Sequence, residues 1–200
     1  MTVAIGADIA RFGYDLTGVA IVEDHRVKGL DEWANKDLME TAGRLVNIKK
    51  RYPDSIIAID DTGLGGGVVD RLMELGIEVL AINYGSQAYE HDRFRDKASE
   101  MWWRVRELHD PHMEVNIVYP SFHNLTGRLM AQLAGARYKF DSRGRVWIVK
   151  NDNNSESPDL GDALALAYEA WVTHWMLAPS RRENRIVRNN AVFGQYAPGA

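Results

Sequence analysis

Three aspartates lie directly beside apolar segments, where a charged carboxylate is unfavourable unless a cation or a hydrogen-bond donor balances it. Asp8 ends the first apolar run, Asp60 ends the continuous apolar run at residues 55–60, and Asp162 lies in the first turns of a long apolar helix. Strand ends and a helix start can converge in space, and hard divalent cations such as Mg²⁺ prefer oxygen ligands. Two such ions about 4 Å apart can hold the attacking and leaving oxygens of a phosphodiester. The joint pattern predicts a metal site for phosphodiester hydrolysis.

Each acid also has a simpler interpretation when it is considered alone. Asp8 could bond to the amides of the turn that follows it, and the Asp60-Asp61 doublet is a common turn-forming pair. Asp159 and Asp162 follow a Ser-Pro pair, and any helix favours negative charge in its first turn. What favours the metal site is that all of these acids open a turn beside an apolar element.

Apolar periodicity predicts an α/β domain that places these acids at the ends of strands and helices. Strands are expected at residues 2–8, 15–22, 27–33, 55–60, 78–82 and 114–118, and a β-hairpin at 136–140 and 145–149. Helices are expected at residues 37–51, from the glycine loop to 75, 94–109, 121–135 and 159–177. The first two strands suit an antiparallel hairpin, and the later strand and helix alternation predicts parallel pairing at the centre of a mixed sheet. The last helix carries one apolar stripe, which is typical of core packing.

Composition excludes several classes of protein. The chain has 200 residues, 46% of them hydrophobic and 26% charged, which predicts one folded domain. It has no cysteine, which excludes disulfide scaffolds, thiolate zinc sites and cysteine nucleophiles. No apolar stretch is long enough to span a bilayer, and no secretory signal is visible. A protein that is not secreted is therefore expected.

The charge of the chain is unevenly distributed. The net charge is −4, so the chain does not have the basic character expected of a protein that binds DNA by bulk charge. A role on DNA would need a local patch or a metal site. Residues 178–200 contain four arginines and one glutamate, so we expect a flexible basic tail or an arm for a partner.

The glycine-rich loop at residues 63–67 does not carry a nucleotide-binding signature. Val68 occupies the place of the third glycine of G-x-G-x-x-G, and no phosphate-binding loop with G-K-[ST] occurs in the chain. The glycines more simply allow a backbone to approach a metal site or a phosphate closely. His109 and His112, which flank an Asp-Pro pair, are expected in a surface turn.

Four segments in chain order resemble the C-terminal nuclease domain of the large terminase subunit of tailed bacteriophages, which has a ribonuclease H-like fold. They are GADIARFGYD at 6–15, IDDTGLGGGVVDRL at 59–72, FRDKASEMW at 94–102 and SPDLGDAL at 157–164. The resemblance covers most of residues 3–175. It implies an α/β domain with a central mixed sheet, an antiparallel first hairpin and flanking helices.

The resemblance also implies roles for five residues. Asp8, Asp60 and Asp162 would be the catalytic, metal-binding acids, with Asp60 preferred to the next aspartate because it directly ends the apolar run. Asp159 would be an accessory metal ligand or an orienting group, one helical turn before Asp162. Lys150 stands where such domains often carry a lysine near the scissile phosphate.

The implied activity is that of a divalent-metal-dependent endonuclease with Mg²⁺ or Mn²⁺, two ions in all. It would cut concatemeric viral DNA at the start and end of packaging, in the host cytoplasm. Implied partners are double-stranded DNA, the portal, the small terminase subunit and a packaging ATPase domain of the full-length chain. Residues 1–177 would form the nuclease domain and residues 178–200 its tail.

Three other functions are compatible with parts of the pattern. A junction-resolving or repair nuclease of the same fold would prefer branched to linear duplex. An actin-like or sugar-kinase-like ATP-binding domain also opens with a strand pair and an early aspartate, although it usually needs a longer chain. A catalytically inactive module would bind DNA or a portal-like partner without cutting.

Overall fold

The computed structural model describes residues 2–10, 16–34, 36–112, 116–121, 124–150 and 157–177. Five strands form one mixed sheet in the order β3-β2-β1-β4-β5. They are β1 (Val3–Asp8), β2 (Thr17–Glu23), β3 (Arg26–Trp33), β4 (Ile56–Asp60) and β5 (Val79–Ile82). The β1-β2 and β2-β3 pairs are antiparallel, whereas β1-β4 and β4-β5 are parallel. The predicted first hairpin and the parallel centre of the sheet are confirmed.

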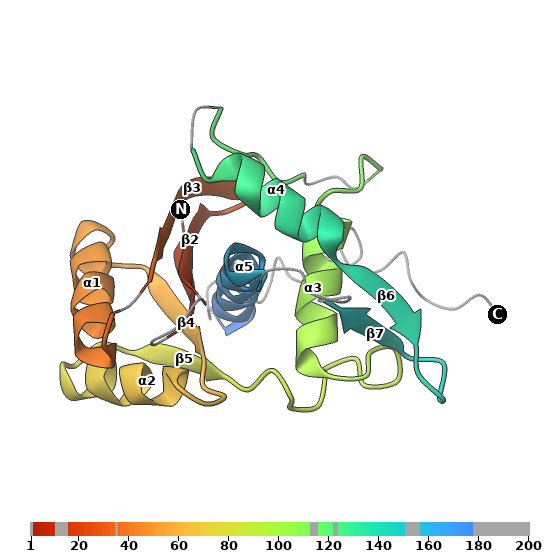
Figure 1. Cartoon of the computed structure of the whole chain (residues 1–200), viewed down its shortest axis with the longest axis horizontal. Helices are drawn as coiled ribbons and strands as arrows, with labels where there is room; N and C mark the ends of the chain where they lie inside the picture. Colours follow the sequence, from red (N-terminus) through yellow and green to blue (C-terminus); the bar gives the residue numbers. More distant parts are fainter. Residues whose placement is uncertain are drawn as a thin grey trace.

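Helices cover both faces of this sheet (Figure 1). One face carries α1 (Leu38–Arg51) and α2 (Gly65–Glu74), and the other carries α5 (Asp159–Leu177). Beyond α5 lie α3 (Lys97–Glu107), α4 (Thr126–Gly135) and a separate hairpin of β6 (Arg137–Phe140) and β7 (Val146–Val149). No helix within the described residues is long and apolar enough to cross a membrane.

The two faces of the sheet differ in side-chain size. Because side chains alternate along a strand, Ile5 and Ile57 pack toward α1 and α2, whereas Gly6 and Ala58 lie on the α5 face. A Cβ atom on Gly6 would lie only 2.0 Å from the carbonyl oxygen of Ala163 in α5. Small residues on this face therefore let the helix pack directly on the strand backbones.

The first three turns of α5 are buried all round, rather than along the single stripe that the sequence predicts. Residues 158–170 are all buried. The reason is that α5 packs between the sheet on one side and α3 and α4 on the other (Figure 1). Within residues 158–170, the stripe is one part of a wholly buried surface.

Three predicted element bounds are wrong. Helix α3 begins three residues later than expected, because the side chain of Asp96 accepts a hydrogen bond from the Ser99 amide at 2.9 Å and caps the helix. Helix α4 begins five residues later than expected. In the predicted strand at residues 114–118, the described part contains only an isolated bridge between Val118 and Arg26.

Other expectations fall on turns and on undescribed segments. His109 and His112 flank a turn, as predicted. The ring of His109 contacts the Val105 carbonyl and the Tyr119 hydroxyl, each at 2.7 Å. Part of the turn expected after Asp8, at residues 11–15, and the tail from residue 178 lie outside the described residues.

Candidate metal centre

Asp8 and Asp60 end two neighbouring parallel strands. Ala7 of β1 pairs with Ile59 of β4, so the aspartates that follow them lie side by side at the carboxyl edge of the sheet. Strand alternation turns both side chains toward the face that α5 covers. The sheet register thereby brings two acids together that are far apart in the sequence.

Asp159 and Asp162 reach the same edge from the first turns of α5. Both side chains are buried, with 4% and 5% of their surface exposed. Gly18 of β2 pairs with Asp8 of β1. A Cβ atom on Gly18 would lie 2.5 Å from the carbonyl oxygen of Asp159. The start of α5 can lie over this edge because Gly18 has no side chain.

The five site residues predicted from the sequence lie close enough to act on one another. The pKa of Asp8 is raised well above its usual value, first by burial and then by the negative charges of Asp162, Asp159 and Asp60. The ammonium of Lys150 opposes that rise. The site is therefore a cluster of like charges with one lysine against it.

Asp162 is held by side chains from three other segments of the chain. Its carboxylate accepts hydrogen bonds from the Lys150 ammonium and from the Trp102 indole N–H, the latter at 2.7 Å. The Tyr84 hydroxyl donates to the Asp162 carbonyl oxygen at 3.1 Å, and the Lys150 ammonium lies 4.3 Å from the centre of the Tyr84 ring. The interpretation of Asp162 as a simple helix-start charge does not account for these bonds.

Tyr84 and Trp102 were not predicted as site residues. Tyr84 follows β5 by two residues, at the same carboxyl edge as the acids, which is the signal that could have found it. Trp102 lies within one of the four matching segments, but a tryptophan in a helix is usually core. Burial and the charges of Asp162, Asp8 and Asp60 raise the pKa of Tyr84, so its hydroxyl stays protonated and can donate.

Asp60 accepts a hydrogen bond from the turn that follows it, as the simpler interpretation predicts. Asp8 accepts none from the described amide of its own turn, that of Ala10. Oδ1 of Asp60 accepts a hydrogen bond from the Thr62 amide at 3.0 Å, as a turn-forming aspartate does. The amide of Ala10 donates to the Thr17 hydroxyl at 3.0 Å, not to Asp8. This difference leaves Asp8 more strongly dependent on an external counter-charge.

The glycine-rich loop lets α2 begin directly against the end of β4. Gly63 has a φ of 79°, which favours glycine, and a Cβ atom on Gly65 would lie 1.8 Å from the carbonyl oxygen of Asp60. The close approach seen here is between the start of α2 and the backbone of Asp60, and the predicted approach to a metal site or a phosphate stays a prediction.

The donor set fits a hard divalent cation, although the side chains do not form a ready cage. Among the described residues, no group of three or more carboxylates or imidazoles could hold an ion as it stands. Asp162 is turned toward Lys150 and Trp102, and Asp60 toward its own turn. The donors are all carboxylate oxygens, which Mg²⁺ and Mn²⁺ accept. Burial first, and then the neighbouring carboxylates, raise the pKa of Asp8, so a bound cation would stabilise its charged form.

Comparison with known proteins gives structural but not sequence matches. No protein-family model matches the chain, and no curated protein sequence matches it. The chain is similar to the nuclease domain of the large terminase subunit gp2 of bacterial virus Sf6, with a TM-score of 0.71 and 19% identity over 82% of this chain and 86% of that chain. A mutant of that domain with manganese and β-thujaplicinol matches at a TM-score of 0.73, 19% identity and the same coverages.

A terminase from a second virus gives the same result. The large terminase nuclease from thermophilic phage G20c with bound magnesium matches at a TM-score of 0.63 and 17% identity, over 84% of this chain and 80% of that chain. The shared features are the mixed five-stranded sheet and its flanking helices. The chain thus has the ribonuclease H-like fold found in the nuclease domains of phage large terminase subunits.

Proposed function

We propose that this chain is a divalent-metal-dependent DNA endonuclease that cuts concatemeric viral DNA during genome packaging. One observation carries the proposal: four carboxylates meet where β1, β4 and α5 end or begin, in a fold shared with terminase nuclease domains. Solved examples of those domains contain manganese, magnesium or cobalt. The chemistry of the cluster and the identity of the fold point to the same activity.

In this proposal Asp8, Asp60 and Asp162 hold the metal, and Asp159 is an accessory ligand or an orienting group. Two bound divalent ions would activate the attacking water and stabilise the leaving 3′ oxygen. The protein's own task is to present these carboxylates deprotonated and close together. Burial beside α5 opposes the loss of protons but strengthens the attraction of the carboxylates for a bound cation, because it excludes water that would screen the charges.

Lys150 and Tyr84 complete the proposed site as donors. Lys150 balances part of the negative charge at Asp162, and its ammonium can pair with a phosphate oxygen when DNA is bound. Tyr84 fixes the backbone of Asp162 through its hydroxyl. Both groups lie at the carboxyl edge where the acids converge, so a phosphodiester at the cluster would lie within their reach.

The hairpin of β6 and β7 offers the DNA contacts that the net charge alone does not predict. Lys139 lies opposite Trp147, with its ammonium 3.9 Å from the ring centre, and the Arg95 guanidinium lies 3.6 Å from the same ring. Within the described residues, no carboxylate forms an ion pair with Lys139 or Arg143. These cations are free to bind phosphates, and β7 leads directly into Lys150.

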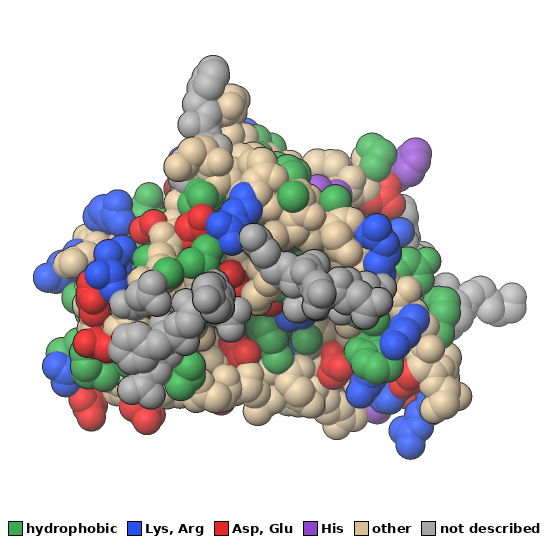
Figure 2. All heavy atoms as spheres, in the orientation of Figure 1, with side chains coloured by type: hydrophobic (Ala, Val, Ile, Leu, Met, Phe, Trp, Pro, Cys, Tyr) green, Lys and Arg blue, Asp and Glu red, His purple; other side chains and the backbone are tan. Residues whose placement is uncertain are grey.

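The surface at this end offers basic side chains (Figure 2). Where β6 and β7 lie, Lys and Arg side chains stand beside hydrophobic and some acidic ones, and a second group of Lys and Arg lies at the α1 end. Contacts to phosphates position a duplex without reading its bases. We therefore propose cutting with little sequence preference.

The remaining parts of the proposal concern partners. The basic residues 178–200 would contact DNA or an acidic partner such as the portal. The small terminase subunit and a packaging ATPase domain of a full-length chain would bring the nuclease to viral DNA in the host cytoplasm. These partners follow from the proposed role in packaging.

The test is incubation of supercoiled plasmid with the protein in Mn²⁺, Mg²⁺ or EDTA. We expect cutting with either ion and none in EDTA. Asp8→Asn should lower the rate about a thousandfold, since loss of a metal-binding carboxylate removes several kcal/mol of transition-state stabilisation. Asp61→Asn is the matched control and should cut like the wild type.

Four outcomes would change the proposal. Cutting that persists in EDTA would overturn the metal mechanism. Full activity of Asp8→Asn would remove that residue from the site, and loss of activity in Asp61→Asn but not in Asp60→Asn would move the ligand by one residue. A strong preference for four-way junctions over linear duplex would favour the junction-resolving alternative.

A further inference from the structure

A square of alternating charges lies behind the candidate metal centre, and the proposed mechanism does not use it. Its corners are Lys97, Glu100 and Arg104 of α3 and Glu169 of α5. Lys97 pairs with Glu100 at 3.0 Å and with Glu169 at 2.8 Å. Arg104 pairs with the same two carboxylates, at 2.9 Å and 2.6 Å. We call these four residues the ion square.

The ion square is buried rather than spread over the surface. Glu100 has no exposed surface, and Glu169 is 7% exposed. Glu100 also accepts hydrogen bonds from the amides of Tyr89 and Glu90, at 3.0 and 3.2 Å. Burial acts to raise the pKa of Glu100, but Arg104, the Tyr89 amide and Lys97 outweigh it, so its pKa is lowered and the carboxylate stays charged.

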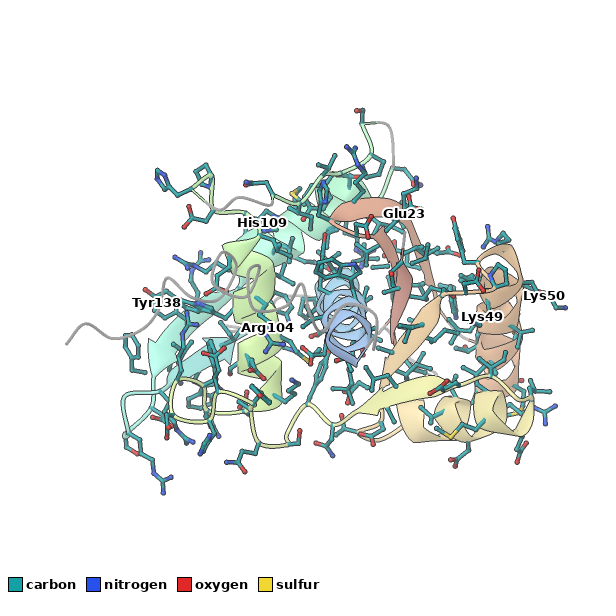
Figure 3. All side chains as sticks on the ribbon, turned by 180° about the vertical axis from the view of Figure 1, so that it is seen from behind. Glu23, Lys49, Lys50, Arg104, His109 and Tyr138 are labelled. Atoms are coloured by element: carbon teal, nitrogen blue, oxygen red, sulfur yellow. The ribbon has the colours of Figure 1, made fainter. Side chains whose placement is uncertain are left out.

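Stability alone does not explain why four charges should be buried here. Withdrawing charges from water is costly, and well-packed apolar side chains often stabilise a core as well or better. What ion pairs add is geometry, because each bond needs one separation and one orientation of its partners. The ion square therefore fixes how far α3 is shifted along α5 (Figure 3, where Arg104 is labelled).

The position of α3 determines where Trp102 lies. Trp102 stands on α3 between Glu100 and Arg104, and its indole N–H donates to Asp162 at 2.7 Å. On α5, Asp162 precedes Glu169 by seven residues, or about two helical turns, so both lie on the side of α5 that meets α3. A shift of α3 would move the indole away from the carboxylate.

The Trp102 ring lies in the buried core and also lines a cavity. The residue is 4% exposed, and the cavity, of about 510 Å³, lies between α3, α4 and the β6-β7 hairpin. The ring contacts Gly161 of α5, where a Cβ atom would lie 2.6 Å from it. Because a cavity beside the ring leaves room for it to move, the contacts that fix α3 along α5 help to determine where the ring lies.

We propose that the ion square is a positioning device that sets Trp102 against Asp162 and so presents the Asp162 carboxylate for metal binding. The same square reaches the site by a second route. The amides of Lys97 and Ala98 donate to the carbonyls of Ser86 and Tyr84, at 2.9 and 3.1 Å, which anchors the loop that carries the Tyr84 hydroxyl. The part of this inference that concerns metal rests on the proposed function, whereas the part that concerns Trp102 does not.

The first test needs neither metal nor DNA. A ¹⁵N spectrum of the metal-free protein shows the tryptophan indole N–H groups, and Trp102→Phe identifies the one of interest. The double variant Arg104→Met with Glu169→Gln removes one cation and one anion and keeps the Lys97-Glu100 pair. We expect the Trp102 indole resonance to move and its hydrogen exchange to accelerate about tenfold or more, while that of Trp33, bonded to Thr41 on the other face, stays unchanged.

The matched control removes an ion pair of the same type elsewhere. Arg71 and Glu74 pair at 3.0 Å on α2, and Arg71→Met with Glu74→Gln should leave the Trp102 resonance unchanged. Arg104→Lys keeps the charge and should retain most of the wild-type signal. An unchanged Trp102 indole in the ion-square variant, with the protein still folded, would overturn the proposal. If that variant does not fold, Arg104→Lys and Glu169→Gln are compared singly by the same measurement.

The second test compares Mn²⁺ binding by the two single variants and by their combination. Binding is measured by the rise in melting temperature that the ion produces. Loss of a group that orients a metal ligand typically weakens binding about 10- to 100-fold, and we expect this for Trp102→Phe and for the ion-square variant. The combined loss should be clearly smaller than the sum of the two single losses, because the square acts in large part through that residue. Fully additive losses would overturn the inference. A wild type with no Mn²⁺ response would instead overturn the proposed function, while the indole measurement would still decide the role of the ion square.

Discussion

The two faces of the central sheet are built for different purposes. The face under α1 and α2 is covered by branched and large apolar side chains, among them Ile5, Ile57 and Leu72. The face under α5 has small residues at the strands, and the buried charged side chains of the described residues all belong to α3 and α5: Glu100, Asp159, Asp162 and Glu169. Both faces bury an apolar core, and the α5 face in addition holds like charges close together.

This difference shows how a folded domain can tolerate a site that lowers its free energy of unfolding. Clustered carboxylates repel each other, and burial adds to the cost of their charge. An apolar face of the same sheet offsets that cost without touching the acids. Stability and chemistry should therefore respond separately to mutation, and five predictions test that separation.

The largest effect is expected where α5 touches the sheet. In Gly6→Ala the new Cβ would lie 2.0 Å from the Ala163 carbonyl oxygen and 2.3 Å from the Ala167 nitrogen, both of them backbone atoms. We expect a loss of more than about 4 kcal/mol in unfolding free energy, or no folded protein. Thermal and urea unfolding measure it.

Gly43→Ala is the matched control in α1. Nothing lies within 4 Å of a Cβ atom at that position, so replacing a helical glycine should stabilise the protein by up to about 1 kcal/mol. Similar unfolding curves for the two variants would show that α5 does not press on the strands.

The second prediction concerns the apolar face. Leu72→Ala removes a fully buried side chain from α2, which should cost about 3 kcal/mol. The melting temperature should fall by roughly 6 to 12 °C. Cleavage per folded molecule and the response to Mn²⁺ should stay as in the wild type. A change in either would mean that the two faces are coupled.

The third prediction links the metal to pH. In the metal-free protein the raised pKa of Asp8 means that, from about pH 4 up to that raised pKa, the folded state binds more protons than the unfolded state. The contribution of Asp8 to stability should therefore decrease as pH rises through this window. Asp8→Asn should flatten that dependence, which melting curves without metal will measure.

Mn²⁺ should reverse the trend, because it replaces the proton as the counter-charge. At about one hundred times its Kd, an ion that binds only the folded protein adds about 2.7 kcal/mol, or roughly 5 to 10 °C in melting temperature. The shift should shrink as pH falls, since the acids must be deprotonated to bind. An equal shift in the wild type and in Asp8→Asn, Asp60→Asn and Asp162→Asn would place the ion elsewhere.

The fourth prediction places the DNA surface on the α5 side. Lys139→Gln should weaken binding of a labelled duplex in EDTA about three- to fivefold and lower the slope of log Kd against log salt by about one. Lys50→Gln, on α1 at the other end of the molecule from Tyr138 of the hairpin (Figure 3), removes the same charge and should change neither quantity. Equal effects at both positions would show only non-specific attraction.

The smallest effect on stability and metal binding is expected from removal of the residues that follow α5. Truncation after Leu177 removes residues 178–200 and should leave the melting temperature and the Mn²⁺ shift unchanged, while DNA binding weakens through loss of four arginines. Loss of the thermal transition would make the tail part of the folded domain and would overturn the expected boundary.

The sequence determined the elements and the type of chemistry. Alternation of small and large apolar residues marks the strands, the charged Asp8 and Asp60 mark where two of them end, and turn residues mark the hairpin at 136–149. These signals are local, because a strand's period and a turn's chemistry depend on neighbours in the chain. The ribonuclease H-like fold itself was implied by the resemblance of four segments to terminase nuclease domains, and these local signals alone indicate only a mixed α/β domain.

Only the tertiary structure decided which residues meet. Trp102 and Asp162 are separated by 60 residues, and Tyr84 and Asp162 by 78, yet each pair forms a hydrogen bond. The ion square likewise joins α3 to Glu169 of α5. Such contacts depend on the register of the strands, on the small residues that admit α5 and on the shift of α3 along it. No local pattern contains that information, because packing distributes it over the whole domain.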